Sequence, residues 1–121
     1  MSNMTEPSQR QLRVGEQLRH VIVETLQKGK FNNILLLDAS HNVTVSEVCP
    51  SPDLKHAKAY IFTLGGKDMD EMLAALNEAA PVFQKEIGKK LTMKFTPKIR
   101  FVKDDSFEEA NKIDSILKNL H

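Results

Sequence analysis

The chain has 121 residues, 40% of them hydrophobic and 27% charged, with a formal net charge of +1. This length suits a single domain whose core needs no disulfide or metal, and the composition excludes the disordered and fibrous classes. No apolar run approaches the roughly 18 residues of a membrane span, the N-terminus is too polar for a secretory signal, and the lone Cys49, which has no internal partner, favours a reducing, cytoplasmic location.

A long first helix is expected to begin at Ser8, after a flexible tail at residues 1–7, and to end at Gly29. Glycine is a common residue just beyond a helix C-terminus, and Lys28 in the last turn suits the helix dipole. The apolar residues of this segment recur at helical spacing: Val14, Leu18, Val21, Ile22, Thr25 and Leu26. Residues 8–121 together form the expected domain.

Two strands are expected after this helix. Residues 29–42 combine the apolar run 34–37 with turn-forming residues, and we expect a loop that this run anchors. The first strand, over 43–49, is rich in β-branched residues and stops at the prolines that follow. The second strand covers 56–64, and the short connection between the two predicts an antiparallel pair.

Two helices joined without a loop are expected between residues 69 and 91. The kink lies at Ala79-Ala80-Pro81, because proline disrupts the turn before it and suits the first turn of a new helix. The first helix has its apolar stripe at Met69, Met72, Leu73, Leu76, Ala79 and Ala80. The second has its stripe at Phe83, Ile87 and Leu91. Lys85 and Lys89 therefore lie on the opposite side of the second helix.

A third strand over 98–103 and a last helix that starts near 104–106 complete the order. The strand has an apolar face and a basic face, with Ile99 and Phe101 on the first and Lys98 and Arg100 on the second. The last helix has its apolar stripe at Ile113, Ile116, Leu117 and Leu120. Its start is favoured by the aspartates and serine at 104–106, which are good N-cap residues.

The element order predicts an α+β fold. The long helical connection between the second and third strands is typical of a crossover between parallel strands, which gives a three-stranded mixed sheet with helices on one face. This is the connectivity of a type II KH module. A ferredoxin-like domain would need a strand before the first helix, and the polar residues before Ser8 offer none.

Positive charge is concentrated in one stretch of the chain. Residues 81–103 carry seven lysines and arginines against Glu86 alone, a net +6, whereas residues 68–80 carry four acidic residues and no basic one. A basic flank of this kind is typical of a surface that binds a polyanion, although surface lysines can also serve solubility alone. We expect nucleic-acid contacts from Arg10, Arg13, Lys85, Lys89, Lys90, Lys94, Lys98, Arg100 and Lys103.

The helix junction bears on how nucleic acid is recognised. A KH module clamps its ligand with a GXXG loop between paired helices. Here the junction Ala79-Ala80-Pro81 contains no glycine, which favours recognition of phosphates and shape over base reading. The two alanines are small either because RNA approaches them or because two helices pack there, and the sequence leaves both explanations open.

The chain resembles the ribosome-binding factor A family, the bacterial small-subunit assembly factors, from about Arg10 to Leu117. The resemblance is carried by an ordered set of short motifs: 13–19 (RVGEQLR), 51–54 (SPDL), 56–58 (HAK), 75–77 (ALN), Ala79-Ala80, Leu91, Pro97, 99–101 (IRF), 104–106 (DDS) and 113–114 (ID). Two features depart from the family pattern. Pro81 stands where the family usually has glycine, and residues 29–42 differ from its usual short loop.

The resemblance implies a non-enzymatic factor with no cofactor. Such a factor binds the free small (30S) ribosomal subunit, supports late maturation of the 5′ region of 16S rRNA and helps growth in the cold. It implies a cytoplasmic protein without membrane contact, and a monomer is the simplest expectation. The rival interpretation is a protein–protein adaptor that uses the last helix and the acidic residues at 68–80, without touching RNA.

A catalytic or metal site finds little support in the sequence. The four histidines are scattered and lack any HExxH or CxxC pattern: His20, His41, His56 and His121. A lone cysteine in a strand, such as Cys49, is usually a small apolar filler. Gly65-Gly66-Lys67 lacks the spacing of a phosphate-binding loop.

Overall fold

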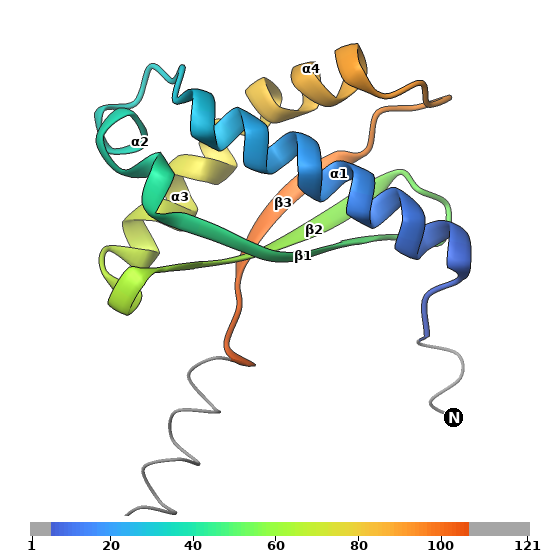
Figure 1. Cartoon of the computed structure of the whole chain (residues 1–121), viewed down its shortest axis with the longest axis horizontal. Helices are drawn as coiled ribbons and strands as arrows, with labels where there is room; N and C mark the ends of the chain where they lie inside the picture. Colours follow the sequence, from blue (N-terminus) through green and yellow to red (C-terminus); the bar gives the residue numbers. More distant parts are fainter. Residues whose placement is uncertain (1–5, 107–121) are drawn as a thin grey trace, which may run out of the picture.

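The computed structural model describes residues 6–106, which form a three-stranded sheet with four α-helices on one of its faces (Figure 1). The helices are α1 (Gln9–Lys28), α2 (Ile34–Ala39), α3 (Met69–Glu78) and α4 (Ala80–Lys90). The strands are β1 (Val43–Pro50), β2 (His56–Thr63) and β3 (Lys98–Lys103), in the order β1-β2-β3. As predicted, β1 and β2 pair antiparallel, and β2 and β3 pair parallel.

The predicted first helix is confirmed, and both of its ends are capped. The Ser8 side chain accepts a hydrogen bond from the backbone N–H of Gln11, and the Gln11 side chain accepts one from the Ser8 N–H. Gly29 closes the helix in the left-handed conformation, with a φ of 65°, and its N–H donates to the Thr25 carbonyl. The six residues of the predicted apolar stripe are all buried.

Gly15 allows the backbone of α1 to approach β1 closely. A Cβ atom at this position would lie 2.3 Å from the carbonyl oxygen of Val48, far inside the normal contact distance. Nearby, the Gln11 side-chain amide donates a hydrogen bond to the Pro50 carbonyl over 3.0 Å. The seating of α1 on the sheet therefore depends on the missing side chain at Gly15.

The expectation of a loop over residues 29–42 is wrong, because this segment contains the short helix α2 and a 3₁₀ turn at Ser40–Asn42. Asn33, a turn former in the sequence, is the N-cap of α2, and its side chain accepts a hydrogen bond from the Leu36 N–H. Leu36 is fully buried, and the buried Ser40 hydroxyl donates to the Leu26 carbonyl. Asn33 and Ser40, which favour turns, thus lie at the N-cap and the C-cap of α2.

The predicted helix pair and its kink are confirmed. The direction changes at Ala79, whose φ of −87° and ψ of 5° are not helical, and Pro81 lies in the first turn of α4, where its missing N–H costs nothing. Ala80 is 8% exposed. This burial favours helix packing, rather than an approaching RNA, as the reason that residue 80 is small.

The helix pair also covers the outer edge of β3. The Asn77 side chain accepts a hydrogen bond from the Phe101 N–H and donates one to the Phe101 carbonyl, and the Gln84 side chain accepts one from the Ile99 N–H. The Phe83 ring packs on Phe101 with 4.9 Å between centroids. These contacts protect an edge that would otherwise expose unpaired backbone groups, and they attach α3 and α4 to the strand.

The expected type II KH-like arrangement is thus present in residues 6–106. The Asp104 carboxylate accepts hydrogen bonds from the backbone N–H and the hydroxyl of Ser106, in line with a predicted helix start. The body of that last helix, residues 107–121, and most of the predicted N-terminal tail, residues 1–5, lie outside the described residues.

Candidate nucleic-acid interface

Three segments that are distant in the sequence lie at one end of the domain (Figure 1), and each of them carries basic residues. These segments are the N-terminal turns of α1, the β1–β2 turn, and residues 91–98 with the start of β3. The Lys98 N–H donates a hydrogen bond to the Lys55 carbonyl over 2.9 Å, which joins the last two segments. We call this surface the basic end; its residues are Arg10, Arg13, Lys55, Lys94 and Lys98, all exposed.

The charges of the basic end are not held in ion pairs. None of its five residues forms an ion pair with another residue in the 6–106 range. The acidic residue closest in the chain to any of the five is Asp53, two residues before Lys55. Its carboxylate accepts hydrogen bonds from the Ser51 hydroxyl and the Lys55 N–H. The Ser51 hydroxyl, with the Lys55 N–H second, holds the pKa of Asp53 below its ordinary value. The cations of the basic end are therefore outside ion pairs, and the one carboxylate beside them, Asp53, attracts Lys55.

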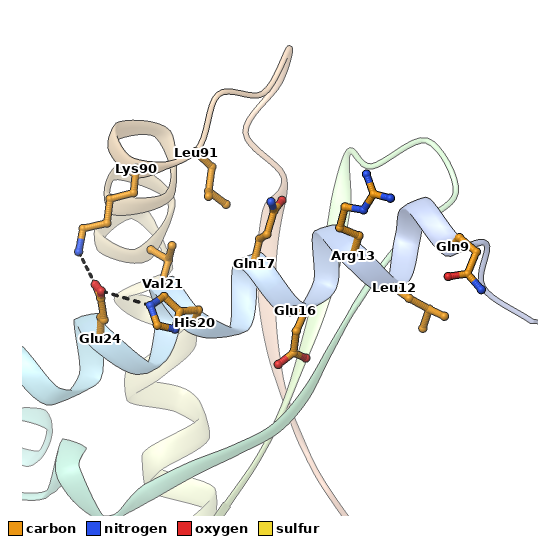
Figure 2. Close-up of a pocket in the computed structure, with 10 residues that line it drawn as sticks. All are labelled: Gln9, Leu12, Arg13, Glu16, Gln17, His20, Val21, Glu24, Lys90 and Leu91. Carbon is orange, nitrogen blue, oxygen red and sulfur yellow. Dashed lines mark hydrogen bonds and ion pairs between the residues drawn. The ribbon is translucent and has the colours of Figure 1, made fainter.

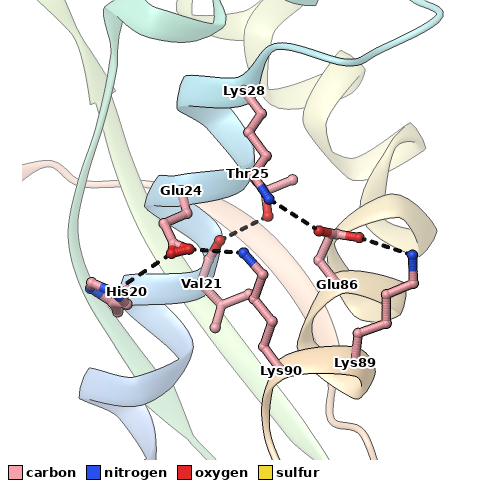
Figure 3. Close-up of polar contacts among 8 residues, drawn as sticks. All are labelled: His20, Val21, Glu24, Thr25, Lys28, Glu86, Lys89 and Lys90. Carbon is pink, nitrogen blue, oxygen red and sulfur yellow. Dashed lines mark hydrogen bonds and ion pairs between the residues drawn. The ribbon is translucent and has the colours of Figure 1, made fainter.

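A second group of lysines surrounds a depression of about 420 Å³ between the C-terminal half of α1 and α4. We call it the helix patch; its residues are Lys28, Lys30, Lys85 and Lys89. The single acidic residue that lines this depression, Glu86, lies 3.8 Å from the Lys28 ammonium and 3.7 Å from that of Lys89 (Figure 3). Part of the positive charge of the helix patch is therefore already compensated.

Lys90, one of the predicted RNA contacts, is held by an acidic residue of α1. Its ammonium donates a hydrogen bond to the Glu24 carboxylate over 2.8 Å, and His20 lies 3.7 Å from the same carboxylate (Figure 3). The bond to Lys90 holds the pKa of the Glu24 carboxyl below its ordinary value, and the bond to Glu24 raises the pKa of Lys90. This pair joins α1 to α4 and leaves Lys90 less available to a phosphate.

The expectation of one continuous basic flank over residues 81–103 is wrong. Side chains alternate across β3, so Ile99 and Phe101 face the helices, and Arg100 is exposed on the opposite face of the sheet. There it pairs in register with Lys58 of β2, which is also exposed. Lys103, at the far end of β3, lies 3.8 Å from Asp105.

The nine predicted contacts consequently separate into groups. Arg10, Arg13, Lys94 and Lys98 lie at the basic end, and Arg100 lies beyond it, on the same open face of β3 as Lys98. Lys85 and Lys89 lie in the helix patch. Lys55 was missed, since nothing in the local sequence indicates that β2 will start next to β3. Phe95 is also absent from the predicted contacts, although an aromatic residue beside Lys94 in a non-helical loop could have indicated one.

Arg13 also borders the depression that runs along α1. Figure 2 shows Arg13, Leu12 and His20 on the α1 side of this depression, and Lys90 and Leu91 on its α4 side. Leu12 is 54% exposed. The depression is lined by apolar and titratable residues, and His20, Glu24 and Lys90 among the titratable ones are engaged in the contacts described above.

Within residues 6–106 no group of three or more histidine, cysteine or acidic residues could hold a metal ion. In the same range no helix is both long enough and apolar enough to cross a bilayer. The exposed Cys49 thiol lies 3.2 Å from a Glu47 carboxylate oxygen. Partial desolvation of the sulfur, together with Glu47, raises the pKa of Cys49 to about 11. A thiol with this pKa is a poor nucleophile at neutral pH.

Cys49 is expected to react slowly with iodoacetamide. At pH 8 its alkylation should be at least tenfold slower than that of free cysteine, whose pKa is about 8.5, because only the thiolate attacks. The rate profile should rise toward pH 11. Glu47→Gln should move the profile to lower pH and Lys58→Met to higher pH, since Glu47 raises the pKa and Lys58 lowers it. A wild-type profile centred near pH 8 would contradict this account.

Comparison with known proteins places the chain in a family. The family model for ribosome-binding factor A matches residues 10–117. The ribosome-binding factor A of Methylorubrum extorquens (strain PA1) is 43% identical over 113 residues, which cover 93% of this chain and 77% of the relative.

Solved structures agree with this match. The solution structure of a Thermotoga maritima protein described as a ribosome binding factor A has a TM-score of 0.68 and 27% identity, covering 84% of this chain and 92% of that one. A homology model of Thermus thermophilus ribosome binding factor A, as fitted into the cryo-EM map of a 30S-RbfA complex, has a TM-score of 0.58 and 20% identity, covering 75% of this chain and 91% of that one. By its sequence match over residues 10–117, the chain belongs to the ribosome-binding factor A family.

Proposed function

We propose that this protein binds the small ribosomal subunit by placing its basic end against the phosphates of 16S rRNA. The observation that carries the proposal is the convergence of Arg10, Arg13, Lys55, Lys94 and Lys98 from three distant segments, with no ion pair among residues 6–106 to neutralise them. Cations outside ion pairs bind phosphates without first breaking such a pair, and each contact releases counterions from the RNA.

Membership of the ribosome-binding factor A family supports the small ribosomal subunit as the partner. A homology model of a relative with the same fold has been fitted into the cryo-EM map of its complex with the 30S subunit. The protein acts without catalysis: its part in ribosome assembly is to bind RNA by charge and shape, in the cytoplasm, and to support late maturation of the 5′ region of 16S rRNA and growth in the cold. The junction at Ala79-Ala80-Pro81, which lacks the glycines of a GXXG loop, supports a contact made elsewhere than in the usual KH manner.

Cosedimentation with purified 30S subunits across a salt series tests the proposal. Five phosphate contacts predict a slope of log affinity against log salt of about −4, so affinity should fall on the order of 10²- to 10³-fold between 50 and 200 mM salt. Purified 50S subunits serve as the control and should bind much more weakly. A flat salt dependence would favour the protein–protein adaptor, and equal binding to both subunits would contradict a specific small-subunit factor.

The maturation role has its own test. In a strain that lacks its own ribosome-binding factor A, expression of this chain should restore 16S rRNA with a mature 5′ end and growth at low temperature. Accumulation of the 5′-extended precursor despite expression would contradict the proposed role.

A further inference from the structure

Phe95 is an exposed aromatic residue that the packing of the fold does not explain. Its side chain is 56% exposed, whereas Phe31, Phe83 and Phe101 are 5% exposed or less. Burying a phenylalanine side chain fully is worth about 1.5–3 kcal/mol, and this site gives up much of that stabilisation. Phe95 lies in the loop between α4 and β3, directly before Thr96 and the buried Pro97.

Two cations of the basic end flank the Phe95 ring. The Lys94 ammonium lies 5.6 Å from the ring centroid and the Lys55 ammonium, from the β1–β2 turn, lies 5.9 Å from it. Both distances are within the range of a cation–π interaction, which is worth roughly 0.5–1 kcal/mol at an exposed site. The two ammonium groups lie over the ring while more than half of the residue's surface stays open to solvent, so a base that stacks on the ring takes the place of an ammonium group.

Phe95 and Lys94 also line a depression of about 520 Å³. Arg10 contributes a cation to the depression in addition to Lys94, and Val14 and Leu54 contribute apolar surface. A volume within the range of roughly 300–1,000 Å³ is typical of sites for small ligands and has room for one nucleotide. The acidic residue in this depression, Asp53, has one carboxylate oxygen occupied by the Ser51 hydroxyl and the Lys55 N–H.

We propose that the Phe95 ring stacks on an unpaired RNA base while Arg10 and Lys94 bind the phosphates on either side of it. Proteins hold single-stranded RNA with an aromatic face next to cations. A base stacks on the aromatic face, and the cations bind the phosphates that link successive nucleotides. The inference rests on the proposed RNA-binding function and narrows it: the basic end takes an unstacked nucleotide, such as one in a loop or at a strand end, and not only a duplex backbone.

A tryptophan reporter tests the stacking directly. The chain contains no tryptophan, so Phe95→Trp introduces a single indole at the site. Titration of the full-length variant with a single-stranded RNA hexamer should quench its emission as a base stacks on the indole. Leu64→Trp is the matched control, because Leu64 is 83% exposed in the turn between β2 and α3, at the other end of β2. Its emission should not change.

Affinity measurements separate stacking from charge. Phe95→Leu keeps the apolar volume and removes the π face, and we expect it to weaken hexamer binding about 5- to 150-fold, as loss of one stacked base does. The salt slope should stay unchanged. Lys94→Gln should reduce the magnitude of the slope by about 0.7, the value for one phosphate of a single strand. Phe95→Tyr should bind like wild type, and all variants should keep the wild-type melting temperature.

The outcomes distinguish this inference from the proposed function. If wild type binds 30S subunits but Phe95→Leu binds the hexamer as well as wild type, or the Phe95→Trp emission is unchanged at saturation, the stacking site is wrong and the RNA-binding function stands. If wild type binds neither the hexamer nor 30S subunits, the proposed function and the inference both fail.

Discussion

Gly15→Ala is expected to lower the free energy of unfolding by about 2 kcal/mol. The new Cβ would lie 2.3 Å from the Val48 carbonyl oxygen, so α1 must move away from β1. Overpacking of this kind costs up to about 3 kcal/mol, and the better helix propensity of alanine recovers only about 1 kcal/mol. The melting temperature should fall by roughly 4 °C for each kcal/mol at this chain length.

Gly88→Ala is the matched control, because it makes the same substitution inside another helix. A Cβ at Gly88 would meet the Thr96 hydroxyl at 3.3 Å, a side-chain atom that can move a few tenths of an ångström. This variant should be neutral or up to about 1 kcal/mol more stable, owing to helix propensity. Urea unfolding followed by circular dichroism measures both variants. Equal stability of Gly15→Ala and wild type would mean that α1 does not rest on β1 as described.

Reversing the charge of the basic end should abolish detectable binding to 30S subunits. The variant replaces Arg10, Lys55, Lys94 and Lys98 by glutamate. If each lost phosphate contact contributes about 1 kcal/mol, four of them reduce the affinity roughly 10³-fold before any repulsion is counted. Cosedimentation in 100 mM salt measures the loss, and a native circular dichroism spectrum confirms that the variant is folded.

The matched control reverses the four lysines of the helix patch, Lys28, Lys30, Lys85 and Lys89. The change in net charge is the same, so a difference between the two variants reports contact and not overall charge. Because the Debye length in 100 mM salt is about 10 Å, reversal of a patch that does not touch RNA should cost tenfold or less. A larger loss in the helix-patch variant than in the basic-end variant would move the interface to the helices.

This comparison refines the expectation from the sequence for four of the nine predicted contacts, Lys85, Lys89, Lys94 and Arg100. In the structure Lys85 and Lys89 lie in the helix patch, Lys94 lies at the basic end, and Arg100 lies on the opposite face of the sheet from the helices. A single variant that combines substitutions at all four residues would not separate these surfaces. Grouping the substitutions by surface makes the position of the RNA measurable.

Local signals in the sequence were sufficient for most elements. The Ser8 cap, Gly29 and the apolar stripe between them predicted α1 within a residue at each end. Pro81 after two alanines predicted the junction of α3 and α4. Residues 29–42 were misjudged because Asn33 favours a turn and a helix cap equally well, and only the burial of Leu36 distinguishes the two.

The arrangement of charge was beyond the reach of such signals. Lys55 and Lys98 meet because β2 and β3 pair in parallel after a long crossover, and strand alternation sends Arg100 to the open face. Helical periodicity and helix capping depend on residues a few positions apart, so both can be identified in the sequence itself. A surface lysine has no packing preference of its own, and its neighbours are those to which the folded backbone carries it.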